Sequence, residues 1–161
     1  MTTPLLSDFG ISLNQPLYLY QQPMFSLTVS VVLIIDNGVL MLKEETYRFP
    51  GGGVRASQES VQFAAVRYVK EQTGIMLKKD ALIPVDFRSD PDRTKEKNVV
   101  DIGFACMLHD VSPENFIYNK TNVVWEEVDF ENGCLVCKSK FYMDHEVLLE
   151  RALTIACMMK E

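Results

Sequence analysis

Apolar residues recur along the chain with two periods, one typical of strands and one typical of helices. The run Phe25–Ile35 is rich in β-branched residues and ends at Asp36-Asn37-Gly38, a strong hairpin signal; a second apolar run follows over Val39–Lys43. Three later runs predict further strands over Leu82–Phe87, Val99–Leu108 and Val123–Val128. The polar segment Ser89–Lys97 predicts a loop between the first two of these strands.

Two segments repeat apolar residues every three to four positions, as a helix packed on a sheet does. The first runs over Val61–Thr73, where Ser60 is a good N-cap and Gly74 is a natural left-handed terminator. The second begins after Asp144, and its apolar face comprises Val147, Leu148, Leu149, Ala152, Leu153, Ile155 and Ala156. This order of elements predicts an α/β (α+β) fold with helices packed on the faces of a mixed sheet.

The first two dozen residues follow neither period. Pro4, Pro16 and Pro23 interrupt this segment, although Leu17–Tyr20 are apolar. We predict an N-terminal arm over residues 1–23 and one compact domain over residues 24–161. The arm could pack on the domain's own sheet edge, pair with a second copy in a homodimer, or form a loosely packed tail.

Composition and charge narrow the classes of function. Of the 161 residues, 47% are apolar, which suffices for one core without metal or disulfide support. A formal net charge of -6 argues against a nucleic-acid partner, because phosphate binding needs basic surface. No apolar run approaches the roughly 20 residues that span a bilayer, so we expect a cytoplasmic protein without a membrane partner. Cys134 and Cys137 form a single pair, which favours reduced thiols over zinc or dithiol chemistry.

One motif carries candidate chemistry. Three glycines, Gly51 to Gly53, follow Pro50 and predict a sharp turn before the first helix. From there the sequence matches the spacing of the Nudix box, G-x5-E-x7-R-E-U-x-E-E-x-G-U with U aliphatic, at Gly53, Glu59, Arg67, Val69, Glu71, Gly74 and Ile75. Segments beyond the box resemble ADP-ribose pyrophosphatase-like members of the Nudix superfamily, namely Ser89–Arg93, Val99–Phe104, Val124–Asp129 and Phe141–Leu148.

The resemblance implies a Nudix-type α/β/α sandwich with the signature helix and a C-terminal helix on a mixed sheet. It also implies hydrolysis of a nucleoside diphosphate linked to another moiety, in which glutamates hold Mg²⁺ or Mn²⁺. On this reading Glu71 is the catalytic residue and a metal ligand, and Gln72 is a weaker carbonyl ligand. The substrate contacts would be Gly52, Gly53 and Arg93. Glu59 and Arg67 would form a structural ion pair.

Two positions depart from the box. Tyr68 and Gln72 stand where glutamates belong, so one helical face presents a phenol and an amide instead of paired carboxylates. We therefore expect recognition of a small-molecule nucleotide diphosphate of the ADP-ribose type, with Mg²⁺-dependent hydrolysis weak or lost. One alternative is an active enzyme that uses carboxylates outside the box, with candidates Glu44, Glu45, Glu126 and Glu127. Another is a structural or subunit-interaction protein that needs no cofactor.

Overall fold

The computed structural model of the protein describes residues 25–55, 57–95, 98–112, 122–137 and 139–160. Its strands are β1 (Ser26–Ile35), β2 (Gly38–Lys43), β3 (Tyr47–Arg48), β4 (Gly51–Gly53), β5 (Ile83–Arg88), β6 (Val99–Leu108), β7 (Val123–Asp129) and β8 (Cys134–Leu135). Its helices are α1 (Val61–Thr73), the short 3-10 helix η3 (Lys79–Ala81) and α3 (His145–Lys160). Across these described ranges the helices lack the length and apolar content of a membrane span. The arm over residues 1–23 lies outside the described residues, so the domain boundary stays a prediction.

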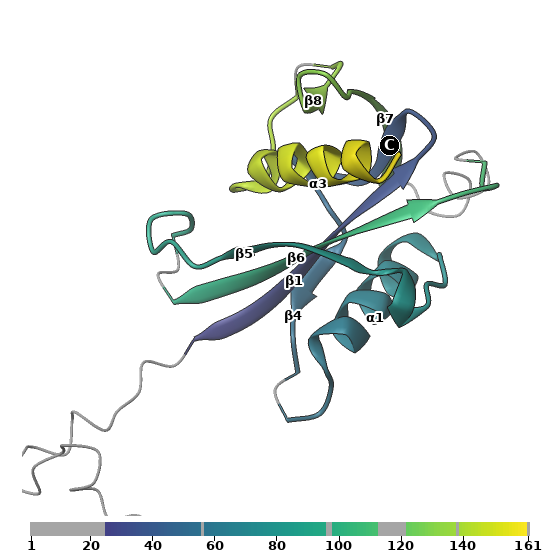
Figure 1. The fold of residues 1–161 in the computed structure, drawn as a ribbon. Helices are drawn as coiled ribbons and strands as arrows, with labels where there is room; N and C mark the ends of the chain where they lie inside the picture. Colours follow the sequence, from purple (N-terminus) through teal and green to yellow (C-terminus); the bar gives the residue numbers. More distant parts are fainter. Residues whose placement is uncertain (1–24, 56, 96–97, 113–121, 138, 161) are drawn as a thin grey trace, which may run out of the picture.

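The strands form one mixed sheet in the order β5-β6-β1-β2-β7-β8 (Figure 1). β1 runs parallel to β6, with Ser26 opposite Val99. On its other side β1 pairs antiparallel with β4 through Thr28–Ser30 and with β2 through Leu33–Ile35. The central strand therefore changes neighbours halfway along its length, and the glycine strand β4 lies beside its first half.

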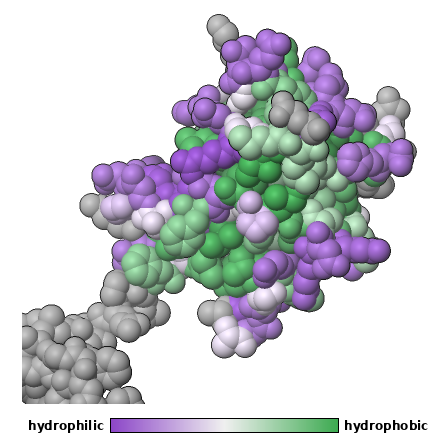
Figure 2. Space-filling view, in the orientation of Figure 1, coloured by the Kyte–Doolittle hydropathy of each residue, from purple (hydrophilic) through white to green (hydrophobic). Residues whose placement is uncertain are grey.

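The helices α1 and α3 cover opposite faces of this sheet (Figure 1). Successive side chains of a strand point to opposite faces, and β1 supplies both cores in this way. One core packs Val31 and Leu33 with Val69 of α1, and the other packs Val32 with Leu148 of α3. Figure 2 shows apolar side chains reaching the surface between the two helices, with hydrophilic side chains around them. The predicted α/β/α arrangement is confirmed.

The hairpin and the first helix end where the sequence indicates. Asp36 takes a φ of 54° between β1 and β2. The Ser60 side chain accepts a hydrogen bond from the Phe63 N–H at 3.1 Å, and Gly74 ends α1 with a φ of 82°. Each of the five predicted strands begins and ends within one residue of its expected bounds.

The prediction for the three glycines is wrong. They form the strand β4, antiparallel to β1, instead of a sharp turn. Their small size serves close packing: a Cβ on Gly51 would overlap the Val29 carbonyl oxygen, and a Cβ on Gly52 would lie 2.5 Å from Cζ of Tyr68. Glycine is needed here because the strand is pressed between β1 and α1.

Candidate functional site

A pocket of about 340 Å³ opens where the first half of β1, the strand β4 and the beginning of α3 meet. Its wall includes Thr28 and Ser30 from β1, Gly51 and Gly52 from β4, and Tyr142 just before α3. The volume lies within the range of small-molecule sites. The pocket lies beside the glycine strand β4, which precedes α1, the signature helix that carries most of the box. The box resemblance places a ligand in this region.

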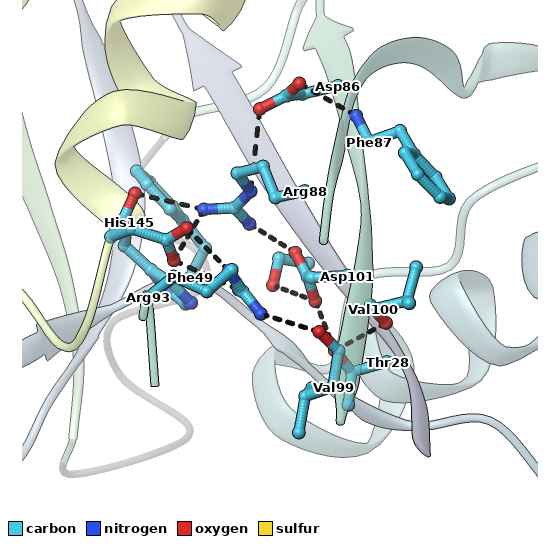
Figure 3. A network of polar contacts seen from close by, with 12 residues as sticks. Thr28, Phe49, Asp86, Phe87, Arg88, Arg93, Val99, Val100, Asp101 and His145 are labelled. Carbon is cyan, nitrogen blue, oxygen red and sulfur yellow. Dashed lines mark hydrogen bonds and ion pairs between the residues drawn. The ribbon is translucent and has the colours of Figure 1, made fainter. Parts of the chain in front are cut away.

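A buried ionic network backs this pocket (Figure 3). Asp101 of β6 is 3% exposed, and one of its carboxylate oxygens accepts hydrogen bonds from the hydroxyls of Thr28 at 2.6 Å and Ser30 at 3.1 Å. The other oxygen pairs with Arg88 of β5. A buried carboxylate is tolerated only when its charge and its acceptor sites are compensated. These three partners provide that compensation.

Asp144 joins two arginines to the same network. Nη1 of Arg88 lies 2.8 Å from its carboxylate, and Arg93 donates to both carboxylate oxygens at 2.7 and 3.1 Å. Burial raises the pKa of Asp144, but the hydrogen bond from Arg93 and the positive charges of Arg88 and Arg93 together outweigh burial, so the pKa lies below its ordinary value. The network combines three arginines with three aspartates, namely Arg88, Arg93, Arg151, Asp86, Asp101 and Asp144. Its formal charges therefore cancel.

His145 stands neutral in the pocket wall. Its Nδ1 accepts a hydrogen bond from the Phe49 N–H at 3.0 Å, and its ring stacks on Phe49 with centroids 5.7 Å apart. Burial lowers the pKa of His145 to about 4, because the charged ring loses solvation inside the protein. The Tyr142 ring meets His145 edge-on at 5.6 Å and is itself 42% exposed. Tyr142 thus offers the pocket an aromatic face that suits a planar base.

Glu59 and Arg67, the expected structural pair, form a two-point ion pair. Nε and Nη2 of Arg67 donate to the two carboxylate oxygens of Glu59 at 2.9 and 2.6 Å. The Arg55 N–H also donates to Glu59 at 2.9 Å. The hydrogen bonds from Arg67 hold the pKa of Glu59 at about 2, and Glu59 in turn raises the pKa of Arg67. The pair ties the loop before α1 to the helix.

The two departures from the box both contact the glycine strand. The Tyr68 hydroxyl donates to the Gly53 carbonyl at 2.9 Å. The Gln72 side-chain amide donates to the Gly51 carbonyl at 3.0 Å, and its oxygen accepts from the Gly51 N–H at 2.9 Å. The helix face that the family pattern fills with carboxylates is therefore hydrogen-bonded to the backbone of β4.

Among the residues that the structure describes, the box side chains do not form a grouped set of metal ligands. Within the described ranges, no group of three His, Cys, Asp or Glu side chains could hold an ion. Glu71 is 51% exposed at its side chain and pairs with Arg67 at 3.4 Å, while the amide oxygen of Gln72 already accepts a hydrogen bond. Mg²⁺ favours anionic oxygen ligands in an octahedral set. The metal roles of Glu71 and Gln72 stay predictions.

Carboxylates outside the box have partners of their own. Glu44 lines the pocket and pairs with Arg48 at 3.1 Å. Glu126 accepts from the Tyr47 hydroxyl at 2.9 Å, and Glu127 accepts from the Asn37 amide at the same distance. Of these three, Glu44 alone lines the pocket.

Sequence reasoning found part of the pocket wall and missed part. Gly52 and Arg93 line it, whereas Gly53 does not. Glu44, a candidate carboxylate outside the box, also lines it, and the polar and aromatic wall residues that were missed include Thr28, Ser30, Arg48, Asp101, Tyr142 and His145. One signal was available for two of them: polar residues two positions apart in an otherwise apolar strand point to the same side. The remaining wall residues come from separate segments that only the folded chain brings together.

Comparison with known proteins identifies the family of this chain and a similar protein. The sequence model of the NUDIX domain family matches residues 24–132. A curated ADP-ribose pyrophosphatase from Methanocaldococcus jannaschii is 34% identical over 91 residues, which cover 53% of this chain and 52% of that protein. The chain thus spans about half the length of this relative.

Solved structures share the fold. A MutT/nudix family protein from Enterococcus faecalis superposes with a TM-score of 0.69 at 20% identity, covering 96% of this chain and 70% of that one. The NUDIX domain of Shewanella oneidensis NrtR, crystallised with ADP ribose, gives a TM-score of 0.63 at 18% identity, covering 86% and 96%. At these identities the likeness concerns the fold.

Proposed function

The chain belongs to the Nudix family, and from that premise we propose that its pocket recognises a nucleoside diphosphate linked to another moiety, of the ADP-ribose type. We further propose that Mg²⁺-dependent hydrolysis of this ligand is weak or lost. The similar archaeal protein is named an ADP-ribose pyrophosphatase, and one similar fold was crystallised with ADP ribose. These likenesses support the ligand class.

The loss of hydrolysis rests on one observation: the signature helix presents Tyr68 and Gln72 to the glycine strand. A metal-dependent attack of water on phosphorus needs cations that neutralise charge and lower the pKa of the water. Two of the three carboxylates expected on that face are absent from the sequence. Each lost metal contact costs several kcal/mol of transition-state stabilisation, and about 1.4 kcal/mol is a tenfold change in rate.

The surroundings of the pocket favour a ligand with two moieties. A second hollow shares Arg93, Thr94, Tyr142 and Met143 with the first pocket. It adds Lys95 and Lys140, two cations suited to a phosphate. We propose that the nucleoside lies in the first pocket beside Tyr142 and that the rest of the ligand runs across the shared wall.

Binding and hydrolysis are tested on the same protein preparation. Titration calorimetry with ADP-ribose should show saturable binding. Chromatographic detection of AMP in the presence of Mg²⁺ or Mn²⁺ should show turnover at least about 1,000-fold slower than that of a full-box Nudix pyrophosphatase run in parallel. Turnover comparable to that control, and abolished by Glu71→Gln, would reject the loss of hydrolysis. Failure of ADP-ribose and other nucleoside diphosphates to bind would reject the ligand class.

A second candidate is an active hydrolase that uses a carboxylate outside the box. The placement of Glu44 in the pocket wall favours this candidate. It predicts measurable metal-dependent AMP release that Glu44→Gln removes, whereas our proposal predicts that the wild-type protein with Glu44 in place already releases AMP only at the low rate stated above. The third hypothesis, a subunit-interaction role, concerns the arm over residues 1–23 and lies outside the described residues.

A further inference from the structure

Tyr68 and Gln72 act on the glycine strand as a pair. Together they make three hydrogen bonds to β4, from the Tyr68 hydroxyl to the Gly53 carbonyl and from both ends of the Gln72 amide to Gly51. The distances lie between 2.9 and 3.0 Å. We call these three hydrogen bonds the helix–strand clamp. Both side chains lie on one face of α1, because residues four apart are neighbours on a helix.

Packing holds the phenol of the clamp in place. The Tyr68 ring lies against Gly52, where a Cβ would come within 2.5 Å of Cζ. The Arg67 guanidinium also lies over the ring, with its Cζ 4.2 Å from the ring centroid. Arg67 is itself fixed by its two hydrogen bonds to Glu59. The tyrosine therefore fills its site closely, and the clamp does not depend on one flexible contact.

We infer that this clamp takes the place of a divalent cation as the link between the signature helix and the pocket wall. With the glutamates of the family pattern at positions 68 and 72, the helix would present only acceptors to the carbonyls of Gly51 and Gly53. Two acceptors that face each other repel, and a cation between them relieves that repulsion. The phenol and the amide instead bring their own donors, so the joint closes without metal.

The clamp also positions the pocket. Gly51 and Gly52 line the pocket, and β4 pairs with Thr28–Ser30, which form the adjoining wall. Fixing Gly51 from both its N–H and its carbonyl sets this wall before any ligand arrives. Ligand binding in the pocket is therefore independent of metal. This last step rests on the proposed function, whereas the metal-free joint does not.

The decisive variant restores the family's carboxylates. Tyr68→Glu/Gln72→Glu joins Glu71 to give three carboxylates on or beside the face that meets β4. We expect this variant to melt lower than wild type in EDTA and to regain about 4 °C when Mg²⁺ or Mn²⁺ is present at roughly ten times its dissociation constant. The wild-type Tm should be the same in EDTA and in Mg²⁺. The control Gln58→Glu/Gln62→Glu adds two carboxylates four residues apart, one just before α1 and one in its first turn, and should not respond to metal because both lie outside the clamp.

Each outcome decides the inference. A wild-type protein stabilised by Mg²⁺ overturns it, and so does a folded double variant that ignores metal. If the double variant does not fold, ADP-ribose titration of wild type decides: equal affinity in EDTA and Mg²⁺ supports the inference, and binding at least about tenfold tighter in Mg²⁺ overturns it.

Tyr68→Phe separates positioning from bulk stability. It removes the hydrogen bond to Gly53 and keeps the ring. We expect faster hydrogen exchange at the β4 amides and weaker ligand binding, with β6 and α3 unchanged. Unchanged exchange in β4 would overturn the positioning role. If ADP-ribose fails to bind even wild type, the proposed function fails, while the melting and exchange experiments still judge the clamp.

Discussion

Acidification should destabilise the fold through His145. The neutral ring accepts a hydrogen bond from the Phe49 N–H, and burial lowers its pKa to about 4. In the unfolded chain the pKa returns to its ordinary value near 6.5. Between these values the unfolded state binds the extra proton, so the stability contributed by the neutral ring is complete above pH 6.5 and is lost as pH falls toward 4.

The two pKa values give the size of this loss. Their difference of about 2.5, at about 1.4 kcal/mol per unit, corresponds to about 3 kcal/mol between pH 7 and pH 4. Carboxylates with lowered pKa values, such as Glu59 at about 2 and Asp144, also stabilise the folded protein, and this stabilisation is lost when acidification protonates them. Their unfolded pKa values lie near 4, so their contribution falls mainly below pH 4.5. The interval from pH 6.5 to pH 4.5 therefore reports on His145.

His145→Asn is the matched variant, because an asparagine oxygen can accept from the Phe49 N–H without titrating. The free energy of unfolding is measured by urea titration at a series of pH values. Between pH 6.5 and pH 4.5 it should fall more steeply for the wild-type protein than for the variant. Parallel curves over that interval would refute the claim that a buried, neutral His145 supports the fold. A steeper fall in the variant would refute it as well.

Two further predictions concern the pocket wall. Asp101→Asn removes the main counter-charge of the buried Arg88 guanidinium and should cost about 3 kcal/mol of unfolding free energy, measured by urea titration; a loss below about 0.5 kcal/mol would mean that the remaining aspartates suffice. Gly52→Ala should cost about 1–3 kcal/mol because its Cβ meets the Tyr68 ring. Gly53→Ala should be nearly neutral, since a Cβ there meets nothing within 4 Å; equal losses in the two alanine variants would contradict this close packing.

The secondary structure could be predicted because its signals are local. The β-branched run before Asp36, the N-cap at Ser60 and the terminator Gly74 each act through neighbouring residues. The glycine strand could not be predicted in the same way. Consecutive glycines favour a turn when read locally, and the reason for them here is the approach of Val29 and Tyr68, which come from elsewhere in the chain.

In the candidate site, too, the residues identified by a local motif could be predicted, and those brought together only by the fold could not. The Nudix box has fixed spacing, so the sequence alone located Glu59 just before the signature helix and Arg67 and Glu71 on it. The pocket wall combines β1, β6 and the start of α3, and the ionic network joins Asp101 to Arg88 across two strands. Pairings of this kind depend on strand order and register, which a single sequence does not reveal.

The box keeps the residues that have a structural role and differs at positions where the family pattern has glutamates for metal binding. Glu59 and Arg67 are a charge pair that needs no third group, and the pair is intact here. Positions 68 and 72 differ, because carboxylates facing backbone carbonyls are favourable only when a cation lies between them. Their replacement by two hydrogen-bond donors would remove that need while keeping the helix bound to the pocket wall. A protein that retains recognition and gives up hydrolysis would be expected to alter these two positions together, since changing either one alone would leave a carboxylate facing a carbonyl without its metal.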